Sequence, residues 1–98
     1  MSENKAATYL GFARRAGKLT LGVNAAQTIR TCYLLVADRD VGKNSRKEIE
    51  KLKDKFSCPL VYCENLGDMV ARPGCMLAAV REEHLARAAY EALGANRG

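Results

Sequence analysis

Three short apolar runs interrupt an otherwise mixed chain, and each one predicts a buried strand. They are YLLVAD at 33–38, LVYC at 60–63 and CMLAAV at 75–80. A short continuous apolar run is typical of a strand that is covered on both faces, as in a parallel or mixed sheet between layers of helices. A briefer extended piece is predicted at 19–21, where two leucines flank a threonine.

Helical segments lie between these runs, and residues that start or stop helices mark their ends. Ser2 is placed to cap the first helix and Gly17 to end it. The SRKE sequence at 45–48 predicts a capping box, and Asn65 is placed to cap a very short helix. The predicted helices cover 3–16, 24–31, 45–56, 66–70 and 82–93, the last closed by Gly94.

The alternation of helix and strand predicts the fold class. It favours an α/β fold, a three-layer α/β/α sandwich with a small central mixed sheet of about four strands. Residues 1–98 contain no linker, repeat or low-complexity stretch, so we expect a single domain. In such folds, ligands gather where loops leave the carboxyl ends of the strands.

The charge is distributed unevenly along the chain. Residues 1–53 carry eleven Lys/Arg against five Asp/Glu, a net charge of +6, whereas residues 54–98 carry five against six, a net charge of −1. This asymmetry is typical of a protein that binds a polyanion, and a well-solvated basic surface is the alternative. Aromatic residues make up only 6% of the chain, which argues against a stacking platform for single strands.

The N-terminus and the cysteines bear on the cellular compartment. The sequence MSENKAATYL lacks the apolar core of a secretory signal, and no apolar run approaches the ~20 residues that span a bilayer. We therefore expect a soluble, cytoplasmic protein. Cys32, Cys58, Cys63 and Cys75 include no C-x-x-C pair, so we expect reduced core cysteines, with no metal site and no cofactor.

An enzyme is one alternative that the residues leave open. General acid–base catalysis needs a positioned histidine or carboxylate pair in a cleft. His84 lies beside two glutamates in a predicted amphipathic helix, which is typical of a surface histidine. Asp38 and Asp40 flank a strand end, but turns and caps are the commoner role of such aspartates. We therefore expect no catalytic activity and no small-molecule substrate.

Nucleotide binding is a second alternative, supported by weak signals. LGVN at 21–24 follows an extended piece and opens a helix, as phosphate-binding loops do, but it has one glycine instead of G-x-G-x-x-G. AGKLT at 16–20 ends like a P-loop, yet it lacks the earlier glycine and precedes an extended segment.

The helix start within LGVNAAQTIR predicts a third kind of site. Gly22 permits close backbone approach, the first N–H groups of a helix can face a phosphate, and the Asn24 amide can donate and accept at a base edge. Plain capping is the alternative role of both residues. Three basic or polar segments could surround this start: Arg14, Arg15 and Lys18; Lys43, Asn44 and Arg46; and Arg72. If these segments meet on one rim, they form a site that reads the shape of a folded RNA.

A family resemblance extends from about Tyr9 to Val80. The strings YLGFARRAGKLTLGVNAAQTIR, LLVADRD, GKNSRKEIEKL, CPLVY and NLGDMVARPGCMLAAV follow one another in this order. Together they resemble the kink-turn-binding ribosomal proteins of the L-seven-Ae and L-thirty-e type, and in particular the bacterial YlxQ-like branch. The resemblance implies an α/β/α sandwich that recognises an RNA helix bent sharply at a bulge beside sheared G·A pairs.

The resemblance also implies a set of contact residues. The family motif G-x-N-E-x-x-K opens the second helix; Gly22 and Asn24 match it, whereas Ala25 replaces the glutamate and Thr28 the lysine. The replacements remove an acceptor for guanine edges and a phosphate contact, each worth on the order of 1–3 kcal/mol, and Gln27 is placed to compensate in part. The family's second contact loop matches Val70, Ala71, Arg72 and Pro73.

The function that follows is non-catalytic RNA binding. Gly22, Val23 and Asn24 would lie against bases and backbone at the bend, and the loop of Arg72 would pack on the opposite side. The expected partner is a ribosomal or regulatory RNA with a kink-turn-like bend, with the ribosome as a candidate partner and no membrane. The alternative function is a protein-interaction module of the ribosome or of the transcription or translation machinery, which would use the helical faces.

Overall fold

Helices and strands alternate along the described part of the chain. The computed structural model describes residues 2–94. Its elements are α1 (Ser2–Arg15), β1 (Leu19–Leu21), α2 (Val23–Ala26), β2 (Leu34–Asp38), α3 (Lys43–Phe56), β3 (Leu60–Cys63), α4 (Leu66–Met69), β4 (Leu77–Val80) and α5 (Glu83–Gly94). The strands form one four-stranded sheet in the order β1-β4-β2-β3. Strands β2 and β3 are parallel, and β4 is antiparallel to both β1 and β2, so the predicted mixed sheet is confirmed.

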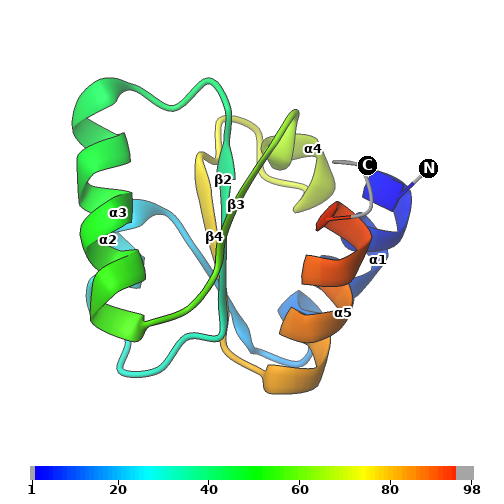
Figure 1. Cartoon of the computed structure of the whole chain (residues 1–98). Coiled ribbons are helices and arrows are strands. Elements are labelled where there is room, and N and C mark those ends of the chain that lie inside the picture. The colour runs from blue at the N-terminus through cyan, green and yellow to red at the C-terminus, as the bar shows by residue number, and fades with distance from the viewer. Residues whose placement is uncertain (1, 95–98) are drawn as a thin grey trace.

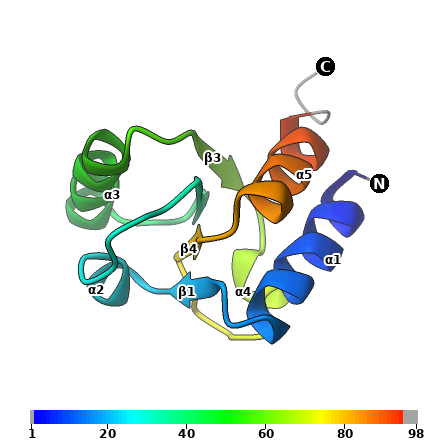
Figure 2. The same ribbon diagram turned by 90° about the horizontal axis from the view of Figure 1, so that it is seen from below.

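The sheet lies between two layers of helices, which confirms the predicted sandwich. Helices α2 and α3 cover one face, and α1, α4 and α5 cover the other (Figures 1 and 2). The buried side chains accordingly form two clusters: Leu34 and Val36 belong to the cluster under α1, α4 and α5, whereas Leu35 and Ala37 belong to the cluster under α2 and α3. Every residue of β2 and β4 is buried, because both strands are central and covered on both faces.

Helix ends follow the predicted signals at some places and depart from them at others. Gly17 ends α1 with φ +72°, and the N–H of Lys18 bonds the carbonyl of Ala13 at 2.7 Å, as in a Schellman motif. Helix α5 extends to Gly94, the predicted closing residue. The predicted cap by the Ser2 side chain lies outside the side chains that the structure describes.

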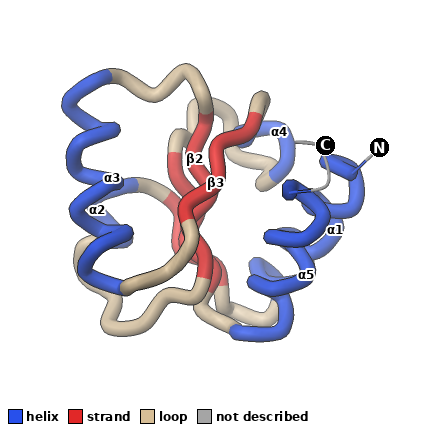
Figure 3. Tube along the Cα trace, in the orientation of Figure 1, coloured by secondary structure: helices blue, strands red, loops and turns tan. Residues whose placement is uncertain are grey.

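Helix α2 is much shorter than the sequence suggests, so that prediction is wrong. A helix was expected over 24–31, but α2 is a single turn, Val23–Ala26. The hydroxyl of Thr28 donates a hydrogen bond to the carbonyl of Ala25 at 2.7 Å. This side-chain bond satisfies a carbonyl that a longer helix would bond to a backbone N–H. The β-branched Ile29 follows, and such residues favour helix weakly. The chain therefore leaves the helix and runs as a loop to β2 (Figure 3).

Two predicted caps are also wrong. Helix α3 begins at Lys43 with Gly42 at the N-cap position, so Ser45 and Glu48 lie inside the helix and form no capping box. Asn65 does precede α4, but it adopts φ 58° and its side chain makes no capping hydrogen bond. Strands β2 and β4 begin at Leu34 and Leu77, slightly later than the apolar runs predict.

Glu82 caps the start of α5 from the residue before the helix. Its Oε2 accepts a hydrogen bond from the backbone N–H of Leu85 at 2.6 Å, and its Oε1 lies 3.0 Å from Nδ1 of the exposed His84. The hydrogen bond from Leu85, followed by that with His84, lowers the pKa of Glu82, because both favour the ionised carboxylate. The charged form of Glu82 therefore stabilises the helix start.

Replacing Glu82 with glutamine is expected to remove part of the acid sensitivity of folding. A carboxylate whose folded pKa lies below its ordinary value of 4.5 stabilises the fold above that value and loses the contribution as pH falls through the folded pKa. The drop in Tm from about pH 7 to about pH 3 should therefore be smaller in Glu82→Gln than in the wild type. Glu83→Gln removes the neighbouring charge and is the control; equal drops in all three proteins would contradict the assignment.

Candidate nucleic-acid interface

One end of the sheet brings together segments that are far apart in the sequence. The N–H of Gly22 bonds the carbonyl of Leu77 at 2.8 Å, and the N–H of Asp38 bonds the carbonyl of Met76 at 2.9 Å. The chain entering β4 therefore lies between the end of β1 and the end of β2. We call this end the upper edge, after its place in Figure 1. It consists of residues 22–24, 38–44 and 70–76.

Gly22 turns the chain from β1 into α2 in a conformation that other residues avoid. Its φ of 97° and ψ of 149° lie in a region that is essentially restricted to glycine. A Cβ at this position would meet nothing within 4 Å, so the space beside the backbone is open. Another molecule can therefore approach the backbone of Gly22 closely. A single turn of helix has a small dipole, so backbone N–H groups rather than the predicted longer helix provide any attraction for phosphate here.

A groove lies between α2 and the start of α3. Its volume is about 370 Å³, and its lining is polar apart from Val23. The lining residues are Val23, Asn24, Gln27, Asn44, Ser45 and Glu48. Across the groove, Nε2 of Gln27 donates to Oε1 of Glu48 at 3.2 Å. The amide expected to compensate for the missing motif residues is thus held by a carboxylate from α3.

The loop before β4 forms the other side of the upper edge. The N–H of Arg72 bonds the carbonyl of Gly67 at 2.8 Å. A Cβ on Gly67 would lie 2.9 Å from the carbonyl oxygen of Arg72, so only glycine permits this approach. Ala71 has φ 56°, a strained value for alanine. This packing leaves Ala71, Arg72 and Pro73 exposed, whereas Val70 is buried in the core. Val70 therefore contributes its backbone and not its side chain to the surface.

Besides Arg72, two of the predicted cations lie at the upper edge or point to it. A guanidinium nitrogen of Arg14, at the end of α1, donates to the carbonyl of Val70, so this side chain reaches the loop before β4. Lys43 is exposed at the first position of α3. Arg15 instead lies 5.3 Å from the ring centre of Phe12 on its own helix.

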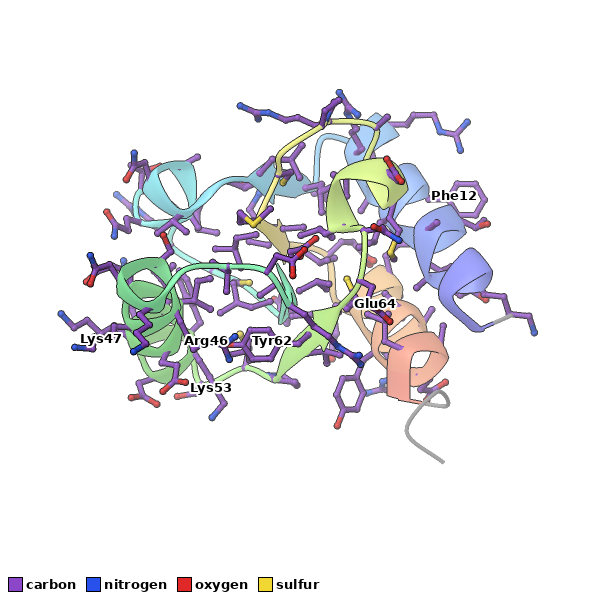
Figure 4. The ribbon with its side chains drawn as sticks, turned by 90° about the horizontal axis from the view of Figure 1, so that it is seen from above. Phe12, Arg46, Lys47, Lys53, Tyr62 and Glu64 are labelled. Carbon is purple, nitrogen blue, oxygen red and sulfur yellow. The ribbon has the colours of Figure 1, made fainter. Side chains whose placement is uncertain are left out.

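Two further predicted cations are used elsewhere. Lys18 lies at the opposite end of β1, where its carbonyl accepts a hydrogen bond from the N–H of Arg81 at 2.7 Å. Arg46 is half-buried, with its guanidinium 4.6 Å from the ring centre of Tyr62 (Figure 4). The structure therefore does not bring Lys18 to the upper edge, and it holds Arg46 against the sheet.

Asp38 is a buried carboxylate that organises the upper edge. Its Oδ1 accepts from the N–H of Asp40 at 2.8 Å, and its Oδ2 accepts from the N–H of Leu66 at 3.0 Å. These bonds join the turn after β2 to the start of α4 and supply the cap that Asn65 does not. The turn-and-cap role that the sequence favoured for Asp38 is confirmed.

Two charged groups of this region, Arg39 and Glu48, were missed by the sequence reasoning. Arg39 forms an exposed ion pair with Glu64, with Nη1 and Oε2 3.6 Å apart. Its position directly after a predicted strand was the available signal, because strand ends meet at one edge of a sheet. Glu48 was assigned to a capping box, and nothing in the sequence indicates that it crosses to Gln27.

Among the comparisons with known proteins, only those with solved structures give a match, and they support the fold. No protein-family model and no curated protein matches the sequence. A Bacillus halodurans protein of unknown function has a TM-score of 0.77 at 22% identity, over 92% of this chain and 97% of that chain. The 15.5kD RNA binding protein of Giardia lamblia has a TM-score of 0.69 at 12% identity, over 96% of this chain and 86% of that chain. The chain shares the fold of an RNA-binding protein. Among the described residues, no helix is both long enough and apolar enough to cross a membrane.

Proposed function

We propose that this chain is a non-catalytic, cytoplasmic protein that binds structured RNA with a kink-turn-like bend through its upper edge. One observation carries the proposal: Gly22–Asn24 and the loop of Arg72, which match the two contact segments of the kink-turn family, lie at the same end of the sheet, where Gly22 bonds Leu77 at the start of the strand that follows this loop. The fold shared with the Giardia RNA-binding protein supports the same class of partner. The RNA is of ribosomal or regulatory type.

In this proposal the neutral centre and the charged margin of the upper edge have different roles. The backbone at Gly22 and the amide of Asn24 contact the bases and sugar–phosphate backbone at the bend, and Arg72 packs from the other side. Arg14, Lys43 and Arg72 attract phosphates, so binding weakens as salt rises. The protein stabilises the bent form of the RNA, and no covalent bond changes.

The Gln27–Glu48 pair supports a way to read the RNA without the usual motif residues. Ala25 and Thr28 carry no carboxylate and no ammonium group, but Glu48 presents a carboxylate in the groove beside Asn24. A carboxylate accepts the paired donors of a guanine edge, which is the role that Ala25 lacks. The hydrogen bond from Gln27 orients this carboxylate.

A titration with two RNAs tests the proposal. We expect the protein to bind a kink-turn RNA with submicromolar Kd at moderate salt and to bind a straight duplex of the same length at least about tenfold more weakly. Arg72→Ala should weaken binding to the kinked RNA by about 5- to 150-fold, which corresponds to one lost arginine contact. Arg87→Ala, on the exposed side of α5, is the matched control. Equal affinity for kinked and straight RNA would overturn the proposal.

A further inference from the structure

Two cysteines lie together at the end of the sheet opposite the upper edge. Cys32 precedes β2 and Cys58 precedes β3, and these strands are parallel neighbours whose starts are joined by the hydrogen bond from Leu35 N–H to the Pro59 carbonyl at 3.0 Å. This end lies at the bottom of Figure 1. The side chains of both cysteines belong to the cluster under α2 and α3. The thiol of Cys32 donates to the carbonyl of Leu34 at 3.2 Å, and the two thiols influence each other's pKa.

The pair is buried but borders an opening. The exposed fractions are 5% for Cys32 and 8% for Cys58. Both residues line one open cavity of about 460 Å³, formed by residues 30–33 on one side and 55–59 on the other. A small molecule that enters this cavity therefore meets both residues.

The surroundings give the two sulfur atoms different chemical character. The hydrogen bond from the Cys58 thiol is the largest influence on Cys32; it lowers the pKa of Cys32 against the opposing effect of burial, and the positive charge of Arg81 acts in the same direction. The same hydrogen bond, together with burial, raises the pKa of Cys58. Cys32 is thus the better thiolate, and Cys58 stays protonated beside it.

We propose that Cys32 and Cys58 form a dithiol oxidation site, which reacts with a small hydroperoxide and closes to an intramolecular disulfide. Both cysteines lie two residues before parallel neighbouring strands, in one buried cluster and on one cavity, which brings their side chains into the same small region. The hydrogen bond from Leu35 N–H to the Pro59 carbonyl fixes the two strand starts beside each other, so a disulfide can close without a large rearrangement of the backbone.

The reaction balances in two steps. The Cys32 thiolate attacks one oxygen of the hydroperoxide, the O–O bond breaks, and the other oxygen leaves as hydroxide or alkoxide and takes up a proton. Cys32 is then a sulfenic acid. The Cys58 sulfur attacks the Cys32 sulfur, the S–O bond breaks, and the Cys58 proton leaves with the oxygen as water. The two thiols together lose two electrons, and the hydroperoxide gains these two electrons.

The other two cysteines of the chain provide internal controls. Cys63 and Cys75 belong to the cluster on the opposite face of the sheet, under α1, α4 and α5. The thiol of Cys75 donates to the carbonyl of Leu77 at 3.2 Å. Both are buried cysteines, so burial alone does not distinguish them from the proposed pair.

Peptide mapping of the oxidised full-length protein tests the proposal. After brief treatment with hydrogen peroxide, alkylation and digestion, we expect a peptide pair joined by a Cys32–Cys58 disulfide, with oxidation of this pair at least about tenfold faster than that of Cys63 or Cys75. Cys58→Ser should stop at a Cys32 sulfenic acid that a cyclic dicarbonyl reagent labels. Cys32→Ser should leave Cys58 as unreactive as Cys75.

The wild-type map decides the question even if a variant fails to fold. Oxidation of the four cysteines at equal rates, or a disulfide that includes Cys63 or Cys75, would overturn the proposal. The same holds if Cys58→Ser yields no labelled Cys32 while its circular dichroism spectrum matches that of the wild type. The experiment contains no RNA, so its result is independent of the proposed RNA binding.

Discussion

Asn24→Asp is expected to weaken binding of a kink-turn RNA by about 5- to 150-fold, equivalent to 1–3 kcal/mol. Asn24 is exposed at the upper edge and lines the groove between α2 and α3. Aspartate has nearly the same shape but cannot donate a hydrogen bond, and it brings a negative charge to a surface that faces phosphates. The exposed position means that the fold itself should change little in stability.

Two further variants separate the causes of that loss. Asn24→Ala removes the amide without adding a charge, so it should weaken binding less than Asn24→Asp. Ser57→Asp adds the same charge at the opposite end of the sheet, where residue 57 has φ 51°, a conformation that aspartate tolerates. Equal losses in Ser57→Asp and Asn24→Asp would indicate a general effect of net charge. An unchanged affinity in Asn24→Asp would contradict the assigned contact.

The layers and the sheet were predictable because buried strands require apolar residues, which are visible in the sequence. Strands β2 and β4 are covered on both faces, which excludes polar residues and leaves LLVAD and LAAV as continuous apolar runs. Gly17 was recognisable as a helix end because a left-handed position favours glycine.

The helix starts were less predictable because their partners come from distant segments. Asn65 looked like a cap, yet the carboxylate of Asp38 bonds the N–H of Leu66 in its place. Ser45 and Glu48 have the spacing of a capping box, but α3 begins earlier at Lys43. A local sequence pattern cannot show that a capping group comes from a residue distant in the chain.

The same reasoning explains which parts of the candidate site could be predicted. The convergence of Gly22–Asn24 with the loop of Arg72 follows from topology, because ends of neighbouring strands meet at one edge. The direction of individual side chains does not follow. Arg46 packs on Tyr62 (Figure 4). Val70 is buried, and both outcomes depend on contacts with other elements of the fold. Lys18 lies at the far end of β1 because the strand separates it from Gly22.

Asp38 connects the stability of the fold to the geometry of the upper edge. Its carboxylate is 5% exposed, and it accepts hydrogen bonds from Asp40 in the turn after β2 and from Leu66 at the start of α4. The first of these bonds fixes the turn that leads to α3, and the second fixes the helix that packs under the loop of Arg72. Loss of the carboxylate would leave two backbone donors without their partner.

Asp38→Ala is therefore expected to lower the free energy of unfolding by about 2–4 kcal/mol, because backbone donors near the core lose a charged acceptor. Asp38→Asn keeps one oxygen acceptor and should lose less. Asp40→Ala is the matched control: its side chain is exposed and its backbone N–H stays in place, so we expect a change within about 0.5 kcal/mol. Urea unfolding measures all three. If Asp38→Ala proved as stable as Asp40→Ala, the buried carboxylate would not be what holds the turn and α4 together.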